Sequence, residues 1–149
     1  MKEINSPLAG EMSGHIFFAE DYYGYDDALY ASIKLLELIT KNYNLEDFIS
    51  ALPITFPSPE IKVNCSDNIK FNIVEKILKQ TLIDYSSNDV IKLDGVRVKN
   101  KYGWWLIRAS NTEAVLVIRV EGKSEENKKM LLIEVQKRLK NEGLTLELP

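Results

Sequence analysis

The chain reads DGVRVKNKYGWWLIRASNTEAVLVIRVEG from Asp94 to Gly122, its richest stretch of β-branched, leucine and aromatic residues. This stretch and the residues just before it hold three strand-like runs: Val90–Leu93 continuing to Val98, then Trp104–Arg108, then Val115–Val120. The dipeptides Asp94-Gly95 and Tyr102-Gly103 are turn signals beside the runs. Because strands joined by short turns pair antiparallel, the stretch predicts the centre of an antiparallel sheet.

Amphipathic segments lie on both sides of this stretch. Upstream, isoleucines recur at helical spacing through residues 69–77, and a helix is expected from its cap Asp67 to about Leu82. Downstream, Ser124 is expected to cap a last helix with Leu131, Val135 and Leu139 on its buried stripe. Two such helices can cover one face of a sheet.

A short strand is expected at Glu60–Cys65, and an edge strand at residues 144–148. Residues 57–149 then follow the order β-α-β-β-β-α. The predicted fold class is α+β, with a four-stranded antiparallel sheet and two helices in a domain of roughly 90 residues.

Residues 1–56 are predicted to form a separate α/β portion. It holds a strand at Ile16–Phe18, a helix over 27–41 capped by Asp26 or Asp27, and a shorter helix over 45–52 capped by Asn44. The prolines at 53, 57 and 59 indicate a linker. Charge changes at the same place: residues 1–56 hold 3 basic and 9 acidic residues, residues 57–149 hold 16 and 13.

Composition narrows the class of protein. With 45% hydrophobic residues the 149-residue chain is not of the disordered class, and no apolar run approaches the ~18 residues of a membrane span. A net charge of −3 disfavours nucleic acid as a partner. One cysteine, Cys65, and a first segment without a signal-peptide pattern indicate a cytoplasmic location.

The first candidate site is Gly10–His15, which sets Glu11, Ser13 and His15 between and beside two glycines. Glycine lets the backbone approach a ligand, and a carboxylate with a hydroxyl suits adjacent sugar hydroxyls. Imidazole exchanges protons near neutral pH, so His15 is a candidate for proton transfer. The alternative is a polar turn before a buried strand.

The second candidate site is the loop between the last two strand-like runs, formed by Arg108, Ser110, Asn111 and Thr112. A guanidinium fits phosphate oxygens, and hydroxyl, amide and turn N–H groups can complete an anion site without a metal. The alternative is a tight turn made of turn-forming residues. Zinc spacings, nucleotide-binding glycine motifs and an Asp-rich magnesium loop are absent from the 149 residues, so no metal ligand is expected.

These two motifs, GEMSGH at Gly10–His15 and RASNT at Arg108–Thr112, resemble the sugar-binding and phosphate-binding loops of the α-D-phosphohexomutases. The methionine at position 12 makes the first motif resemble that of the phosphomannomutase/phosphoglucomutase group, since phosphoglucosamine mutases typically carry Gln at this position. Ala114 stands where the family usually has proline, whose absence gives the loop more freedom. The resemblance implies that residues 1–56 are the C-terminal portion of domain 3. It also implies that residues 57–149 are domain 4, a TATA-binding-protein-like fold.

The resemblance further implies a function. Members interconvert hexose 1- and 6-phosphates of mannose or glucose through a phosphoserine and a bisphosphorylated sugar, with Mg²⁺ held in another domain. Glu11 and Ser13 would contact sugar hydroxyls, His15 would assist proton transfer, and the Arg108–Thr112 loop would hold the phosphate that is not transferred.

The serine and magnesium motifs are absent from these 149 residues. The chain alone is therefore expected to be inactive, to need the missing N-terminal domains as partner, and to bind no cofactor itself. The alternatives are a stand-alone phosphosugar-binding module and a portion of a phosphoglucosamine mutase.

Overall fold

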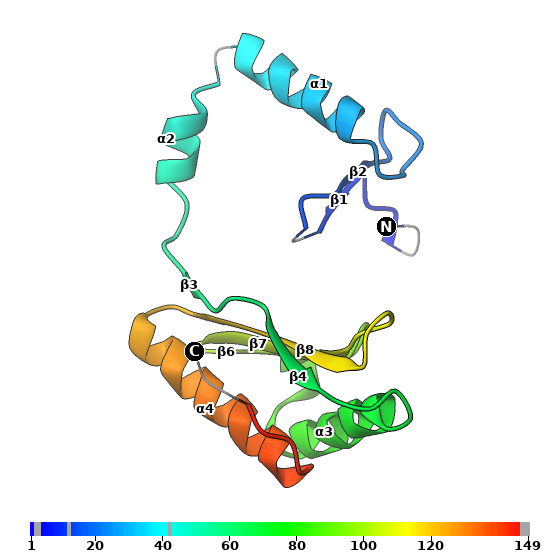
Figure 1. Ribbon diagram of the computed structural model, residues 1–149. Coiled ribbons are helices and arrows are strands. Elements are labelled where there is room, and N and C mark those ends of the chain that lie inside the picture. Colours follow the sequence, from blue (N-terminus) through cyan, green and yellow to red (C-terminus); the bar gives the residue numbers. More distant parts are fainter. Residues whose placement is uncertain (2–3, 12, 42, 147–149) are drawn as a thin grey trace. The chain divides into compact units, whose positions relative to one another are not determined.

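A computed structural model describes residues 1, 4–11, 13–41 and 43–146 (Figure 1). The chain divides into two compact units, Met1–Leu52 (unit 1) and Pro53–Pro149 (unit 2). The division lies close to the linker that the prolines predict. Each unit is described below by itself.

Unit 2 is built on an antiparallel sheet in the order β3-β8-β7-β6-β5, with β4 also paired to β8. Four longer strands form the expected four-stranded sheet: β4 (Ile61–Asn64), β6 (Val96–Asn100), β7 (Gly103–Ala109) and β8 (Val115–Gly122). Two strands of two residues each extend it, β3 (Phe56–Pro57) and β5 (Val90–Ile91). The α+β class with a mostly antiparallel sheet is confirmed.

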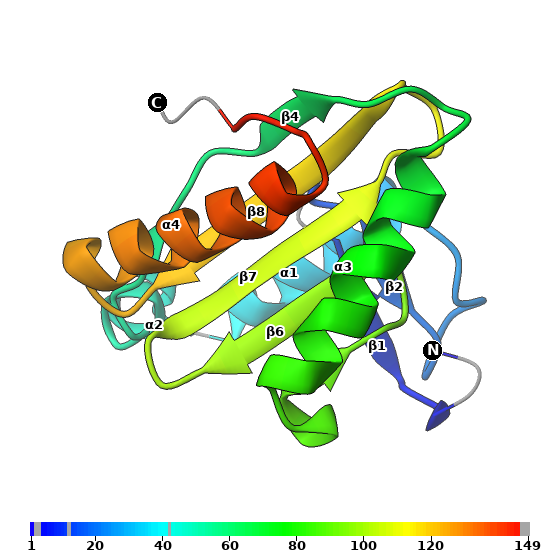
Figure 2. The same cartoon turned by 90° about the horizontal axis from the view of Figure 1, so that it is seen from below.

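Helices α3 (Lys70–Asp84) and α4 (Glu125–Asn141) cover the same face of this sheet, as Figure 2 shows. The core lies between them and the sheet, and its largest fully buried side chains include Trp105, Ile77 and Leu139. Alternation along β7 is regular: odd-numbered residues are buried and even-numbered ones are half-exposed. One face of the sheet is therefore committed to the core, and the other carries no helix from the described residues of unit 2.

Of the two predicted caps of these helices, one is confirmed and the other is wrong. Ser124 caps α4, since its hydroxyl accepts a hydrogen bond from the Asn127 amide at 3.2 Å, as expected. Asp67 does not cap α3, and this prediction was wrong. The helix begins later, after Ile69, without a side-chain cap, and the carboxylate of Asp67 pairs instead with the ammonium of Lys70.

The run predicted over Val90–Val98 is broken into β5 and β6 by the turn at Gly95. Gly95 has φ +97°, and a Cβ there would lie 2.4 Å from the carbonyl oxygen of Ile107. Only glycine fits this position. Residues 144–146 form no strand, although Leu146 is buried, and residues 147 and 148 of the expected edge strand lie outside the described residues.

A buried arginine joins the two helices of unit 2. Arg138 is 7% exposed and donates hydrogen bonds to Thr81 at 3.2 Å and to Asp84 and Glu134 at 3.0 Å. A buried guanidinium is tolerated only when its N–H groups are paired in this way. The short 3₁₀ helix Ser87–Asp89 follows α3.

Unit 1 contains the hairpin β1 (Leu8–Gly10) and β2 (Ile16–Phe18), followed by α1 (Ala28–Thr40) and α2 (Leu45–Ser50). The predicted helices and caps are confirmed: Asp27 accepts from the Tyr30 amide at 2.9 Å, and Asn44 caps α2. None of the residues of α1 is buried within the described structure. Its apolar side chains are largely exposed, for example 73% at Leu29 and 60% at Leu36.

Candidate functional site

The loop between β7 and β8 holds its shape through Ser110. The Ser110 amide donates to the Val115 carbonyl at 3.0 Å, and the Ser110 hydroxyl accepts from the amides of Thr112 and Glu113 at 3.3 and 3.1 Å. Ser110 is 7% exposed, whereas Asn111 and Thr112 are exposed. The serine therefore folds the loop from inside and presents the amide and hydroxyl side chains to solvent.

A buried lysine supports the same loop from α3. Lys70 has a side chain only 5% exposed, and its Nζ donates to the backbone carbonyl of Glu113 at 2.9 Å. Lys62 of β4 pairs with the Glu113 carboxylate at 2.8 Å. The Cys65 amide donates to the carbonyl of Ala114 at 2.9 Å. These contacts restrain the loop, which carries alanine at position 114.

The environment of Cys65 is apolar. Burial raises the pKa of its thiol, and the positive charge of Lys70 opposes that rise. Cys65 is a free, buried cysteine. The thiol is therefore not an activated nucleophile.

Arg108 stands at the start of this loop, and its side chain lies on the face of β7 that points away from the core. Its side chain is 33% exposed, and its guanidinium lies 3.6 Å from the Asp94 carboxylate. That is too long for a tight bidentate pair, so the guanidinium keeps N–H donors for another acceptor. The structure thus brings together all four predicted residues of this loop, namely Arg108, Ser110, Asn111 and Thr112.

The predicted residues of unit 1 also lie together, on the turn between β1 and β2. The Ser13 hydroxyl is 3.0 Å from the Glu11 carboxylate and 2.6 Å from Nδ1 of His15. Nε2 of His15 lies 3.6 Å from the Asp26 carboxylate. Because the tautomer of His15 decides whether its Nδ1 donates or accepts, the cluster allows alternative proton positions. Met12 lies outside the described residues.

Neighbouring groups fix the start of α1 next to this turn. The Tyr30 amide and the Tyr22 hydroxyl, which donates at 2.7 Å, lower the pKa of the Asp27 carboxyl. Tyr22 in turn stacks on Tyr30 with ring centroids 3.9 Å apart. Asp27 is therefore occupied as a helix cap, and Asp26 is the carboxylate that faces His15.

Among the residues that the structure describes, no group of three or more His, Cys, Asp and Glu side chains could hold a metal ion. The described residues therefore do not fit the Mg²⁺ that the resemblance implies for another domain. Within the same part of the chain, no helix is both long and apolar enough to cross a membrane.

Both loops lie in ranges of the chain that match models of known protein families. Residues 60–144 match the model described as "Phosphoglucomutase/phosphomannomutase, C-terminal domain". Residues 1–56 match the model described as "Phosphoglucomutase/phosphomannomutase, alpha/beta/alpha domain III". The chain belongs to the phosphoglucomutase/phosphomannomutase family. The C-terminal match contains the Arg108–Thr112 loop, and the match over residues 1–56 contains Glu11, Ser13 and His15.

Individual relatives agree with this membership. The chain is 38% identical to a phosphomannomutase/phosphoglucomutase of Pseudomonas aeruginosa. The match covers 100% of this chain and 32% of that protein. It is 34% identical to a phosphoglucomutase of Neisseria gonorrhoeae and to a probable phosphoglucosamine mutase of Methanocella arvoryzae, over 84% of this chain and 27% and 28% of those proteins. The chain thus spans about a third of the length of the relatives it matches.

A solved structure is similar over nearly the whole chain. It is a phosphoglucomutase/phosphomannomutase family protein of Burkholderia thailandensis, with a TM-score of 0.81 and 32% identity over 99% of this chain and 31% of that one. The similarity supports the family fold for the described elements.

Two residues beside the site were missed by the sequence reasoning. Lys70 reads as an ordinary solvent-facing position in the first turn of a helix, and nothing in its local pattern indicates that it supports a loop 43 residues away. For Asp26, the local pattern favours a helix cap over a metal ligand and does not predict its contact with His15. The Asp26-Asp27 pair did carry a signal, because a helix start needs one cap and leaves the second carboxylate free.

Proposed function

We propose that this chain supplies two substrate contacts of a phosphohexomutase that interconverts hexose 1- and 6-phosphates through a phosphoserine and a bisphosphorylated sugar. The Arg108–Thr112 loop binds the phosphate that is not transferred. Glu11 and Ser13 bind sugar hydroxyls, and His15 assists proton transfer. The observation that carries the proposal is the Ser110-folded loop, which holds two backbone amides and leaves Arg108 with free donors.

The phosphate assignment follows from the charges around the loop. Arg108 stands at its start, and the ammonium of Lys70 lies beneath it, donating to the Glu113 carbonyl. Asn111 and Thr112 offer exposed amide and hydroxyl donors. Such a loop binds a phosphomonoester through charge-assisted hydrogen bonds and needs no metal for binding.

The sugar assignment follows from the pattern of donors and acceptors in unit 1. Glu11 accepts hydrogen bonds, and Ser13 both donates and accepts, which matches two neighbouring hydroxyls. Hydroxyl contacts that do not involve C2 accept both glucose and mannose. His15, facing Asp26, can hold or pass a proton at the hydroxyl that gains or loses the phosphoryl group.

The remaining chemistry lies outside these 149 residues in this proposal. The phosphoserine and the Mg²⁺ site belong to the enzyme's other domains, which are the chain's proposed partner. Mg²⁺ there would supply charge stabilisation to the transferred phosphoryl group. Alone, the chain binds hexose phosphate modestly and turns nothing over. The proposed setting is the cytoplasm, in keeping with the free thiol of Cys65.

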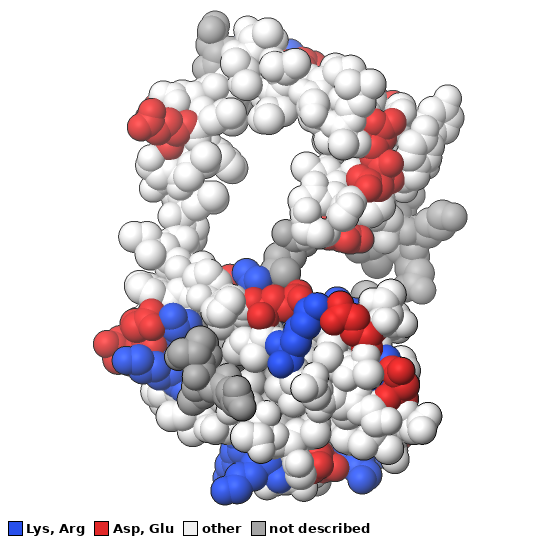
Figure 3. Space-filling model, viewed as in Figure 1, with Lys and Arg blue, Asp and Glu red and all other residues white. Residues whose placement is uncertain are grey.

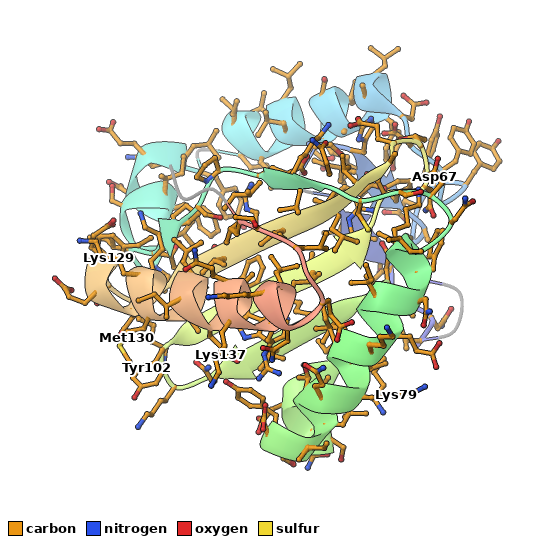
Figure 4. The ribbon with its side chains drawn as sticks, turned by 60° about the horizontal axis from the view of Figure 1, so that its bottom comes forward. Asp67, Lys79, Tyr102, Lys129, Met130 and Lys137 are labelled. Atoms are coloured by element: carbon orange, nitrogen blue, oxygen red, sulfur yellow. The ribbon has the colours of Figure 1, made fainter. Side chains whose placement is uncertain are left out.

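Titration of the ¹⁵N-labelled chain with glucose 6-phosphate tests the phosphate loop. Amide shifts should concentrate at residues 108–113, and Arg108→Ala should weaken binding about tenfold or more. Lys129→Ala, an exposed lysine on α4, is the control that removes the same charge elsewhere (Figure 4). Binding that is unchanged in Arg108→Ala would remove the assignment.

Activity separates the mutase from a stand-alone binding module. The chain should show no mutase activity by itself and should gain activity when the N-terminal domains of a relative are added. Turnover by the chain alone contradicts the proposal, and tight hexose-phosphate binding without any gain on addition favours the module. Mannose, glucose and glucosamine 6-phosphates as substrates of the reconstituted enzyme distinguish the phosphoglucosamine mutase alternative.

A further inference from the structure

The uncovered face of the sheet in unit 2 carries more positive charge than the phosphate loop uses. Strand alternation and register place these basic residues on that face: Lys62, Arg97, Lys99, Arg108 and Arg119. Helices α3 and α4 lie against the opposite face (Figure 2). On the side visible in Figure 3, unit 1 shows acidic side chains and few basic ones. Unit 2 shows both acidic and basic side chains on that side.

Register fixes how the arginines are arranged. Leu106 of β7 pairs with Arg97 of β6 on one side and with Arg119 of β8 on the other. Arg108 lies two residues further along β7, on the same face. Because neighbouring strands are about 4.8 Å apart, Arg97 and Arg119 start about 10 Å apart, and each is a diagonal neighbour of Arg108. The three form a triangle that adjoins the loop.

Arg97 is held in place on this face. Its guanidinium carbon lies 4.6 Å from the ring centroid of Trp104, and the Trp104 indole donates to the Glu121 carboxylate at 3.2 Å. A cation–π contact of this kind does not use the N–H donors of the guanidinium, which stay free for an acceptor. The stack therefore orients Arg97 without consuming its donors.

Glu121 lies on the same face, two residues from Arg119 on β8, but few ion pairs compensate the charges of this triangle. Within the described part of the chain, no ion pair involves Arg97 or Arg119, and only the 3.6 Å contact with Asp94 involves Arg108. Like charges on neighbouring strands repel and destabilise a sheet, whereas a bound anion would relieve that repulsion. The arrangement is therefore suited to an anionic group beyond the one that the loop holds.

We propose that Arg97 and Arg119 form a second anion subsite on the open sheet face, which binds the second phosphate of a hexose bisphosphate. The proposal rests on the proposed function, in which the Arg108–Thr112 loop binds the first phosphate. A bisphosphorylated sugar must turn over before it returns a phosphoryl group. The second subsite gives its other phosphate a cationic partner during that turn, so the sugar stays with the protein.

The test compares two ligands on the full 149-residue chain, glucose 1,6-bisphosphate and glucose 6-phosphate, by calorimetry and by NMR. The chain has two tryptophans, one on each face of the sheet. The indole signal of Trp104, beneath Arg97, should shift with the bisphosphate and much less with the monophosphate. The indole of Trp105, buried in the core against Glu134, should stay in place.

Arg97→Gln and Arg119→Gln should each weaken bisphosphate binding about tenfold and change monophosphate binding by less than about twofold. Lys129→Gln, which removes the same charge from α4, should change neither (Figure 4). An amide spectrum of each variant that retains the native dispersion shows that the fold is intact.

Two results overturn the subsite. One is that Arg97→Gln and Arg119→Gln weaken the binding of both ligands equally, as nonspecific electrostatic attraction predicts. The other is that the native chain binds the bisphosphate no more tightly than the monophosphate. If neither ligand binds to the chain, the subsite is overturned as well. If only the bisphosphate binds, and Arg97→Gln abolishes that binding while Arg108→Ala does not, the subsite stands and the loop assignment of the proposed function fails.

Discussion

The ammonium of Lys70, at the first turn of α3, donates a hydrogen bond to the backbone carbonyl of Glu113, 2.9 Å away in the loop between β7 and β8. Its side chain is 5% exposed. A helix and a loop that are distant in sequence are thus joined by one buried charge. Burying an ammonium is costly unless it is paired, and here the loop carbonyl and the Asp67 carboxylate pair it.

Lys70→Met should therefore act on both the fold and the loop. It removes the ammonium that satisfies the Glu113 carbonyl, and we expect a loss of roughly 1–3 kcal/mol in the free energy of unfolding of unit 2, measured with urea. Glucose 6-phosphate should also bind more weakly, because the charge beneath the loop is gone. Lys70→Arg keeps the charge and should recover part of the affinity. Unchanged affinity in Lys70→Met would show that the lysine serves the fold alone.

Ser110→Ala separates loop shape from general stability. Without the hydroxyl, the amides of Thr112 and Glu113 lose their acceptor, so the loop should open and hexose-phosphate binding should fall severalfold. Ser124→Ala, which removes the cap of α4, is matched to it, and both should cost about 1 kcal/mol in urea unfolding. Only the first should change the binding constant. Equal binding by the two variants would refute the role given to Ser110.

Alkaline pH should destabilise unit 2 through Cys65. Burial raises the pKa of its thiol in the folded state, so the unfolded chain releases this proton first. The stabilisation is complete below the ordinary thiol pKa of about 8.5 and is lost as the pH rises through the folded-state pKa. Unfolding free energies measured from pH 7 to 10 should fall more steeply for the native sequence than for Cys65→Ala. Parallel curves would exclude the thiol as the cause.

The exposed apolar side of α1 should make the chain self-associate. Leu29, Ile33 and Leu36 recur at helical spacing and are 73%, 55% and 60% exposed in the described structure. An apolar stripe of this kind favours association in water. Ile33→Glu with Leu36→Glu should lower the weight-average mass seen by sedimentation equilibrium, with urea unfolding of unit 2 unchanged. A mass that does not depend on concentration in the native chain would contradict this expectation.

Local patterns were sufficient to predict the helices and the longer strands, but not β1, the cap of α3 or the end of the chain. The isoleucine spacing before Asp84, the Ser124 cap and the Gly95 turn each depend on neighbours within one or two turns of chain, where periodicity and steric fit act. For the same reason, the residues of each site loop were found together, since every member lies within six positions of the others.

What the sequence could not provide was contact between distant segments. Asp67 was read as a cap because capping is the commonest local role of aspartate, but the ammonium of Lys70 competes for its carboxylate. The pairing of Lys70 with Glu113 and the flanking of Leu106 by two arginines exist only once strands and helices are placed. The second of these depends on strand register, about which periodicity and propensity carry no information.

The alternation of β7 has a further consequence for how such a domain can change over time. Its odd positions are committed to the apolar interior, while its even positions, from Trp104 to Arg108, meet solvent. A replacement at an even position leaves the interior untouched, so ligand preference can drift without loss of the scaffold. A saturation library across this strand should therefore show tolerance that rises and falls with every second residue.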